Sequence, residues 1–290
     1  MEVLKYLGYL RPYSADSFMM LDKQTRRNLE IFDGGRWGGN GLALLTTLDL
    51  TRTPMGGRLL RKWLGQPFLD LENLNTRQDV VAIFREDTLL RQTSIGFLSR
   101  IPDIERIFNR VKLGIVTPRE LINLNGGIAT TSNLFRCINE SKPREVEWIL
   151  SKVTSCSDVQ SLIDAAVNPE PYGLVGEGGI IKVGYSQELD DIRNVSQDAR
   201  TYIAGLERKE RDRSGVRNLK IKYNKVFGYY IEISNAHLSQ VPEDYIRRQT
   251  LVGGERFVTS ELKEYEAKVL NARGLIMELE KKIYQEICTR

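Results

Sequence analysis

Residues 219–234, LKIKYNKVFGYYIEIS, contain the side chains of this chain that are best suited to binding an anion. Lys220, Lys222 and Asn224 alternate with apolar residues, and YYIEIS returns after the turn-like NKVFG. Because successive side chains of a strand point to opposite faces, the alternation predicts a hairpin with two amines on one face. Amines presented in this way can contact the phosphate oxygens of a nucleic acid.

A second pair of predicted strands adds guanidinium groups to the same region. The stretches YIRRQTLV (residues 245–252) and ERFVT (residues 255–259) are joined by Gly253-Gly254, a strong signal for a two-residue hairpin turn. The sequence therefore predicts a small antiparallel sheet of about four strands. The candidate DNA-binding residues in this region are Lys220, Lys222, Asn224, Lys225, Arg247, Arg248 and Arg256.

The positive charge of the chain is concentrated around these residues. The formal net charge is +4, and residues 200–259 contain 12 Lys and Arg against 7 Asp and Glu. All other residues together contain 30 basic and 31 acidic side chains. A local excess of this kind points to an anionic partner, with nucleic acid as the leading candidate. An ordinary solvated surface accounts for the excess equally well.

Aromatic residues in the same region allow two interpretations. In single-strand binders such rings stack on bases, whereas in a thin sheet they more often form the core. The second interpretation is favoured for this region. The residues concerned are Tyr223, Phe227, Tyr229, Tyr230 and Tyr245.

Few residues are suited to catalysis or metal binding. His237 is the only histidine, and no Walker A motif follows the glycine-rich residues 33–41, which are interpreted as a connector. Three scattered cysteines favour a reducing, intracellular compartment over a disulfide framework. The acidic residues Asp190, Asp191, Glu261, Glu264 and Glu266 are interpreted as solvated flanks of helices, so no catalytic, cofactor-binding or metal-binding residue is predicted.

Two long helices are predicted on either side of the sheet, over residues 186–213 and 260–287. Each carries a narrow apolar seam with heptad spacing, too narrow to bury the helix in a globular core. The two stripes favour an antiparallel pair with the sheet at its tip, and two independent surface helices are the alternative. The seam residues are Ile192, Val195, Ala199, Tyr202 and Leu206 in the first helix, and Leu262, Tyr265, Val269, Ala272, Ile276, Leu279 and Ile283 in the second.

The preceding residues predict further helices, so the fold class is mainly α with a small antiparallel β insertion. Asp22 and Thr53 are predicted helix caps, and Pro54 is predicted at the first position of a helix. An apolar stripe formed by Leu59, Leu60, Trp63 and Leu64 is expected to face a core. Further helices are expected over residues 71–92, 103–112, 118–138 and 143–167, followed by an exposed connection through VNPEPYGLVGEGGIIKVGY.

Several long blocks of the sequence resemble one family in the correct order. They include FMMLDKQTRRNLEI, LLTTLDLTRTPMGGRLLRKWLGQPF, LERKERDRSGVRNLKIKYNKVFGYYIEIS and YIRRQTLVGGERFVTSELKEYEAKVLNA. These blocks are similar to the core, lever and clamp regions of MutS DNA mismatch repair proteins, and the resemblance runs nearly from end to end.

The resemblance implies a domain order and a set of partners. Residues 1–199 would form a helical core with the first lever helix, residues 200–259 the clamp, and residues 260–290 the returning lever helix. In this family the clamp contacts the DNA backbone without sequence specificity, and a homodimer encircles the duplex. The implied partners are mismatched double-stranded DNA, a second copy and a MutL-type protein, in the bacterial cytoplasm at the nucleoid.

The chain also departs from the family pattern. The N-terminal domain with its Phe-x-Glu motif and the ATPase with its Walker motifs are both missing, which is typical of a middle portion of a longer protein. The chain is therefore expected not to be an enzyme, and ATP and Mg²⁺ would belong to the missing domain. Val252-Gly253-Gly254 replaces a lysine-asparagine-alanine type of stretch. This difference argues against a polar contact near the bases at that turn. Arg256 is therefore the better candidate for a DNA contact in this region.

Two functions follow from these patterns. The first is a DNA-binding module whose clamp holds the duplex backbone and whose levers connect it to an ATPase. The alternative is a purely structural lever that binds DNA weakly or not at all. An independent enzyme is the third and least supported interpretation.

The lysine alternation leads to the first testable prediction. Changing Lys220 and Lys222 together to Glu should weaken duplex binding for every DNA sequence, because phosphate contacts carry no sequence information. A salt titration should show a shallower dependence of affinity on salt, because fewer counterions are released. Unchanged affinity and slope would contradict the prediction.

Overall fold

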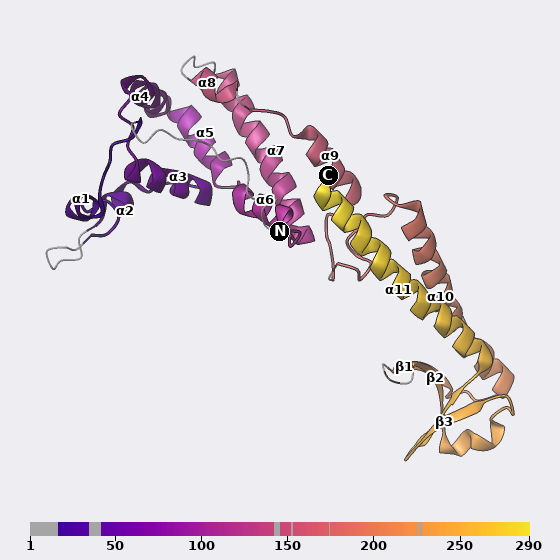
Figure 1. The fold of residues 1–290 in the computed structure, drawn as a ribbon. Coiled ribbons are helices and arrows are strands. Elements are labelled where there is room, and N and C mark those ends of the chain that lie inside the picture. Colours follow the sequence, from indigo (N-terminus) through magenta and orange to yellow (C-terminus); the bar gives the residue numbers. More distant parts are fainter. Residues whose placement is uncertain are drawn as a thin grey trace, which may run out of the picture. The chain divides into compact units, whose positions relative to one another are not determined.

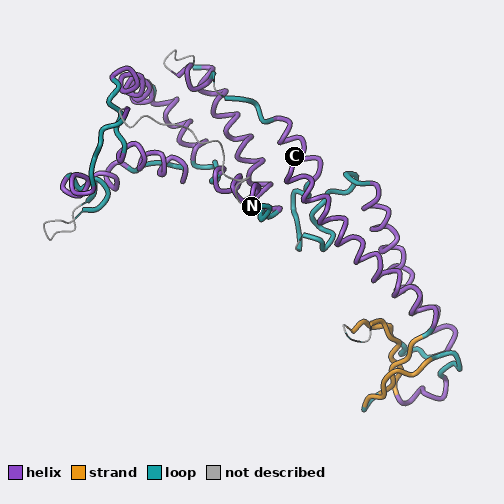
Figure 2. The backbone as a smooth tube through the Cα atoms, in the orientation of Figure 1, coloured by secondary structure: helices purple, strands orange, loops and turns teal. Residues whose placement is uncertain are grey.

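The computed structural model describes residues 17–34, 42–141, 146–151, 153–173, 175–224, 226 and 228–290. The chain divides into two compact units, Met1–Asp164 and Ala165–Cys288, which are considered separately. Helices predominate and one antiparallel sheet is present in the described part, which confirms the predicted fold class (Figures 1 and 2). The three-part division implied by the family resemblance stays a prediction.

The first unit is built from helices whose ends follow the expected capping chemistry. Thr53 accepts a hydrogen bond from Gly56 N, and Pro54 is the first residue of its helix. Thr117 and Glu120 form a reciprocal capping box at the start of another helix. The helices are α1 (Lys23–Asn28), α2 (Leu44–Leu48), α3 (Pro54–Gly65), α4 (Leu71–Glu86), α5 (Thr88–Leu98), α6 (Ile104–Lys112), α7 (Pro118–Glu140) and α8 (Glu147–Leu150).

Two predicted helices of the first unit are interrupted. The helix expected over residues 71–92 is divided into α4 and α5, because Asp87 accepts from Leu90 N and starts a new helix there. The Arg91 guanidinium donates to the carbonyls of Phe84 and Arg85 and so satisfies the end of α4. The helix expected over residues 143–167 is likewise divided, into α8 and α9 (Ser157–Ala166).

The apolar stripe predicted for α3 is only partly buried. Leu59 and Trp63 are exposed, whereas Leu60 and Leu64 are half-buried. The Arg77 guanidinium lies 3.7 Å from the centre of the Trp63 ring, so a cation covers part of this indole. The prediction that all four residues face a core was therefore wrong for two of them. The glycine-rich connector predicted over residues 33–41 falls mostly outside the described residues.

The second unit contains the two predicted long helices, α10 (Gln187–Ser214) and α11 (Ser260–Thr289). They lie side by side and run antiparallel, since Tyr202 stacks on Tyr265 while Lys209, further along α10, pairs with the earlier Glu261 (Figure 1). The interpretation as two independent helices is thereby excluded. The shared core contains Ala199, Ile203 and Leu206 from α10 and Leu262 and Val269 from α11.

In α11, Leu262, Val269, Ala272 and Ile283 are buried as the sequence predicts. In α10, Ala199 and Leu206 are buried as predicted, but the other series of the seam is shifted by one residue. Val195 is exposed, and Ser196 is buried in its place. The residues of α10 that are buried are Leu189, Ser196, Ala199, Ile203, Leu206 and Glu210, spaced as an alternating heptad pattern. Because Ser196 and Glu210 are polar, a search for apolar residues alone did not predict that they are buried.

The sheet follows α10 and has the strand order β1-β2-β4-β3, with every neighbouring pair antiparallel. Its strands are β1 (Lys220–Asn224), β2 (Gly228–Ser234), β3 (Ile246–Leu251) and β4 (Gly254–Val258), and the 3-10 helix η4 (Asn235–Gln240) follows β2. The turn between β3 and β4 consists of Val252 and Gly253. Gly254 belongs to β4, where a Cβ atom would lie 2.4 Å from the carbonyl oxygen of Ile233.

Glutamates of the two long helices accept hydrogen bonds from main-chain N–H groups of β1 and β2. Glu207 of α10 accepts from Ile221 N at 2.9 Å, and Glu266 of α11 accepts from Tyr229 N at 2.9 Å. Glu266 is only 5% exposed, so its prediction as a solvated flank was wrong. Gly228 has φ +75° and permits the close approach, because a Cβ there would lie 1.5 Å from a Glu266 carboxylate oxygen.

A third glutamate holds the segment before β3. Glu210 is 2% exposed and accepts from the Tyr245 hydroxyl at 2.6 Å. Burial of the Tyr245 hydroxyl and this hydrogen bond raise the pKa of Tyr245 above its ordinary value. Arg213 donates to the same carboxylate and supplies the opposite charge that a buried anion requires.

Part of the segment over residues 167–185 is packed against α11, so its prediction as an exposed connection was wrong for that part, although Tyr172 and Val183 are exposed. Ile180 and Ile181 are almost fully buried. Glu280 of α11 is 0% exposed and accepts main-chain N–H groups of Gly176, Gly178, Ile180 and Ile181 at 2.7–3.2 Å. The Arg193 guanidinium of α10 lies 3.5 Å from the same carboxylate. One buried carboxylate thus fixes this segment to both helices.

Removal of the Glu280 carboxylate should strongly destabilise the protein. Glu280→Ala leaves four main-chain N–H groups without their acceptor and removes one ion-pair partner of Arg193, which keeps Asp190, at a cost of about 3–5 kcal/mol. Urea unfolding monitored by circular dichroism measures the loss, with Glu278→Ala, an exposed position of the same helix, as the matched control. Equal stability of the two variants would contradict the buried hydrogen bonds.

The pairing of α10 with α11 near the sheet should depend on pH. Hydrogen bonds from Lys209 and Tyr202 hold the pKa of Glu261 below its usual value of about 4.3. The stabilisation is therefore complete above that value and is lost as the pH falls through the lower pKa of the folded state. The difference in unfolding free energy between wild type and Glu261→Gln should be constant from neutral pH to about 5. It should then shrink below about pH 4, and a difference that grows in acid would contradict this pairing.

Candidate nucleic-acid interface

The strand register separates the sheet into an inner and an outer face. Ile231 pairs with Ile221 on one side and with Phe257 on the other, and these apolar residues pack against α10 and α11. Glu232, the next residue of β2, pairs with Lys220 and with Arg256. Because directly opposed residues of neighbouring strands share a face, the charged residues lie on the face turned away from the helices.

The two lysines of β1 differ in their environment on this outer face. Lys220 is exposed and has no ion-pair or hydrogen-bond partner for its amine among the described residues. Lys222 Nζ lies 2.7 Å from Glu232 Oε1, and this hydrogen bond raises the pKa of Lys222. The sequence places both amines on one face, and the structure adds that one of them is already neutralised.

Arg256 is embedded in the sheet instead of projecting from it. Its side chain is 19% exposed, and its guanidinium lies 4.3 Å from the centre of the Tyr230 ring. It donates to Gln249 Oε1 at 2.8 Å, and its Nε lies 3.8 Å from Glu232 Oε2. Arg256 therefore contributes positive charge to the outer face from a largely fixed position.

The remaining candidates do not join one cluster. Arg247 pairs across the sheet with Phe257, so it lies on the inner-face side at the edge strand, where it binds Glu255. Arg248 lies in the bulge between Arg247 and Gln249 and, together with Arg256 and Lys263, lines a hollow of about 250 Å³. Asn224 accepts from Val226 N and so supports the hairpin turn. Lys225 lies outside the described residues.

A second hollow brings Arg217, which the sequence analysis did not select, together with two lysines that it did select. It has a volume of about 460 Å³ and is lined by Arg217 and Asn218 together with Lys220 and Lys222. Gly215 ends α10 with φ 72°, and Val216 and Leu219 then insert into the core with 0% exposure. Since the residues between them face outward, Arg217 is presented beside Lys220. The alternation of apolar and polar residues in SGVRNLK could have predicted that Arg217 faces outward.

The aromatic residues serve mainly as the core of the sheet, which confirms the favoured interpretation for two of them. Tyr230 and Tyr245 are buried, and Tyr229 is half-buried against the helical cluster. Tyr223 is exposed and lies at a tilted angle to Tyr229, with ring centres 5.0 Å apart. Phe227 lies outside the described residues.

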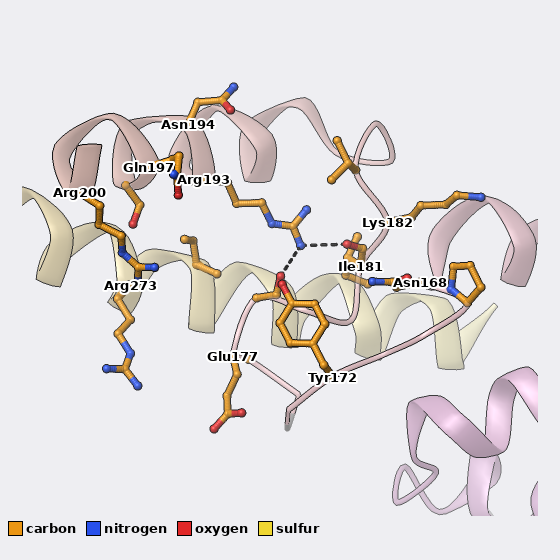
Figure 3. A pocket seen from close by; sticks show the side chains of 16 residues that line it. Asn168, Tyr172, Glu177, Ile181, Lys182, Arg193, Asn194, Gln197, Arg200 and Arg273 are labelled. Carbon is orange, nitrogen blue, oxygen red and sulfur yellow. Dashed lines mark hydrogen bonds between the residues drawn. The ribbon is translucent and has the colours of Figure 1, made fainter. Parts of the chain in front are cut away.

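A groove beside the two long helices is a further polar surface that the sequence analysis missed. Its volume is about 1030 Å³, and α10, α11 and the segment after Asn168 line it (Figure 3). Arg193 crosses it and donates to the carbonyls of Gly178 and Ile181, so this cation is used to hold the segment. Arg200 and Arg273 lie at one end, and both are exposed.

The described residues offer no group of three or more His, Cys, Asp or Glu side chains that could hold a metal ion. Cys137, Cys156 and Cys288 are free thiols, and burial raises the pKa of Cys288. His237 is half-exposed in η4. Within the same ranges, no helix combines the length and the apolar character needed to cross a membrane.

Comparisons with known proteins identify a family and several relatives of this chain. Residues 24–290 match the family model described as MutS domain III. The chain is 41% identical over 286 residues to the DNA mismatch repair protein MutS of Dehalococcoides mccartyi strain 195, which covers 98% of this chain and 33% of that protein. It is 43% identical over 291 residues to the protein of the same name from Methanosarcina acetivorans, covering 99% and 32% respectively. The chain thus spans about a third of the length of these relatives.

Proposed function

The chain belongs to the MutS family, and we propose on that premise that the outer face of its sheet binds the sugar–phosphate backbone of duplex DNA during mismatch repair. The observation that carries the proposal is the hollow in which Arg217 and Lys220 lie beside Lys222. Among the described residues, neither Arg217 nor Lys220 has an acidic partner. Unpaired cations on a solvated face are suited to phosphate oxygens.

The shape of this surface supports backbone contact over base reading. Its cations Arg217, Lys220, Lys222 and Arg256 are carried by short strands and by the turn that follows α10, not by a helix of the kind that enters a major groove. Phosphate contacts fix the position of a protein on DNA without reading the sequence. The proposed interaction is therefore equal for matched and mismatched duplexes, and recognition of a mispair belongs to another part of the longer protein.

The paired helices supply the mechanical part of the proposal. α10 and α11 share one core with the sheet and are bonded to it through Glu207 and Glu266. Such a rigid connection can carry a displacement from an ATPase domain to the DNA-binding face. ATP and Mg²⁺ would act in that domain, so the present chain is proposed not to be an enzyme. The proposed partners are duplex DNA, a second copy and a MutL-type protein in the cytoplasm.

A structural lever with little DNA binding is the second candidate function. The neutralisation of Lys222 and the partial burial of Arg256 favour it, since both reduce the number of cations available to phosphate. A gel-shift experiment at low salt separates the two functions. Retardation of a duplex by this chain supports the DNA-binding function, whereas no retardation supports the lever.

Reversal of the unpaired cations tests the proposed surface directly. Arg217→Glu combined with Lys220→Glu should weaken duplex binding at least about tenfold and reduce the salt slope by roughly two, because two phosphate contacts are lost. Fluorescence anisotropy with matched and mismatched duplexes measures both quantities. Lys281→Glu combined with Lys282→Glu makes the same charge change on exposed positions of α11. Equal losses in both double variants would contradict a localised site.

A further inference from the structure

Glu232 is an acidic residue in the middle of the cationic outer face. It lies in β2, one of the two central strands, between Lys220 of β1 and Arg256 of β4. A carboxylate repels phosphate at the very surface where phosphate is proposed to bind. Its position therefore requires an explanation beyond the general solvation of a strand.

The carboxylate uses both of its oxygens on cations of the same face. Oε1 lies 2.7 Å from Lys222 Nζ, and Oε2 lies 3.8 Å from Arg256 Nε. The side chains of Lys222 and Glu232 are 44% and 30% exposed, so an incoming anion can reach this pair. The Nε atom of Arg256 is buried, so Glu232 acts on Arg256 through its charge. The carboxylate and a phosphodiester are both oxygen anions and compete for the same donors.

The sheet itself does not depend on this carboxylate. Glu232 is held in β2 by main-chain pairing with Lys220 and Arg256, which any residue type in a strand can make. Arg256 keeps its position over the Tyr230 ring and its hydrogen bond to Gln249 without Glu232. The buried glutamates Glu210 and Glu266 differ in this respect, because the contacts of the sheet with the helices depend on them.

We propose that Glu232 is an internal competitor of the DNA backbone, a residue that sets the affinity of this face by pairing with Lys222 and offsetting the charge of Arg256 until a phosphate takes its place on Lys222. The proposal rests on the proposed DNA-binding function and adds its regulation. Binding then exchanges one ion pair for another, so each contact is weak and readily reversed. A face of this kind holds a duplex without immobilising the protein at one position, because unpaired Lys220 and Arg217 provide the first contact.

Removal of the negative charge should tighten DNA binding. Glu232→Gln is expected to increase affinity about three- to tenfold at ~0.1 M salt, because one or two further cations become available. The dependence of log affinity on log salt should steepen by about one to two for the same reason. Fluorescence anisotropy of a short labelled duplex, titrated with this chain at several salt concentrations, gives both values.

Two controls separate local competition from a change in overall charge. Glu243→Gln makes the same charge change at an exposed position of the same region. Lys222→Met removes the principal partner of Glu232, so the gain from Glu232→Gln should be smaller in that background. Thermal unfolding of each variant confirms that the sheet is retained.

Each outcome decides the proposal. A gain specific to Glu232→Gln that shrinks in the Lys222→Met background supports it. Equal gains from Glu232→Gln and Glu243→Gln would show a general charge effect and overturn it. Weaker binding by Glu232→Gln would show that the carboxylate positions the cations for DNA, which also overturns it. Absence of binding by every variant, wild type included, would overturn the DNA-binding function itself.

Discussion

Buried glutamates on two antiparallel helices hold the rest of the second unit in place. A carboxylate that leaves water loses several kcal/mol of hydration, so it stays charged only where donors surround it. Glu280 has four main-chain N–H groups and Arg193, and Glu210 has the Tyr245 hydroxyl and Arg213. Arg193 and Arg213 belong to α10, whereas the N–H groups and the Tyr245 hydroxyl come from segments outside the helices. The non-helical parts of the unit therefore depend on α10 and α11 for their conformation.

The same arrangement decides which charges remain available on the surface. In the basic region, carboxylates such as Glu207 and Glu210 are directed toward the core and the strands. Arg217 and Lys220 project outward without acidic partners among the described residues. The inward use of these two acidic side chains leaves more of the positive charge of residues 200–259 on the surface. Glu232 differs from Glu207 and Glu210 because it lies on the outer face between cations, and this contrast underlies its proposed role.

Local sequence patterns predicted the helices and strands, whereas contacts between residues far apart in the sequence decided which side chains are buried. The alternation of Lys220 and Lys222 was sufficient to place them on one face, because the pleat has a period of two. The bulge beside Arg248 changed the faces of the neighbouring arginines, and a shift of one residue has this effect in any strand. The glycines and prolines of residues 167–185 correctly predicted turns, but they did not predict that Ile180 and Ile181 are buried. Their acceptor, Glu280, lies about 100 residues further along the chain.

The connections between sheet and helices also determine how a force would pass through this unit. Glu207 and Glu210 bind the sheet region to α10, whereas Glu266 binds it to α11. Sliding of one helix along the other would break hydrogen bonds on one side, and the stacked Tyr202 and Tyr265 rings oppose the same movement. The pair of helices and the sheet are therefore expected to move as one body. A rigid body of this kind would deliver a displacement to the proposed phosphate-binding face, and exchangeable ion pairs at Glu232 would allow that face to release and rebind while it moves.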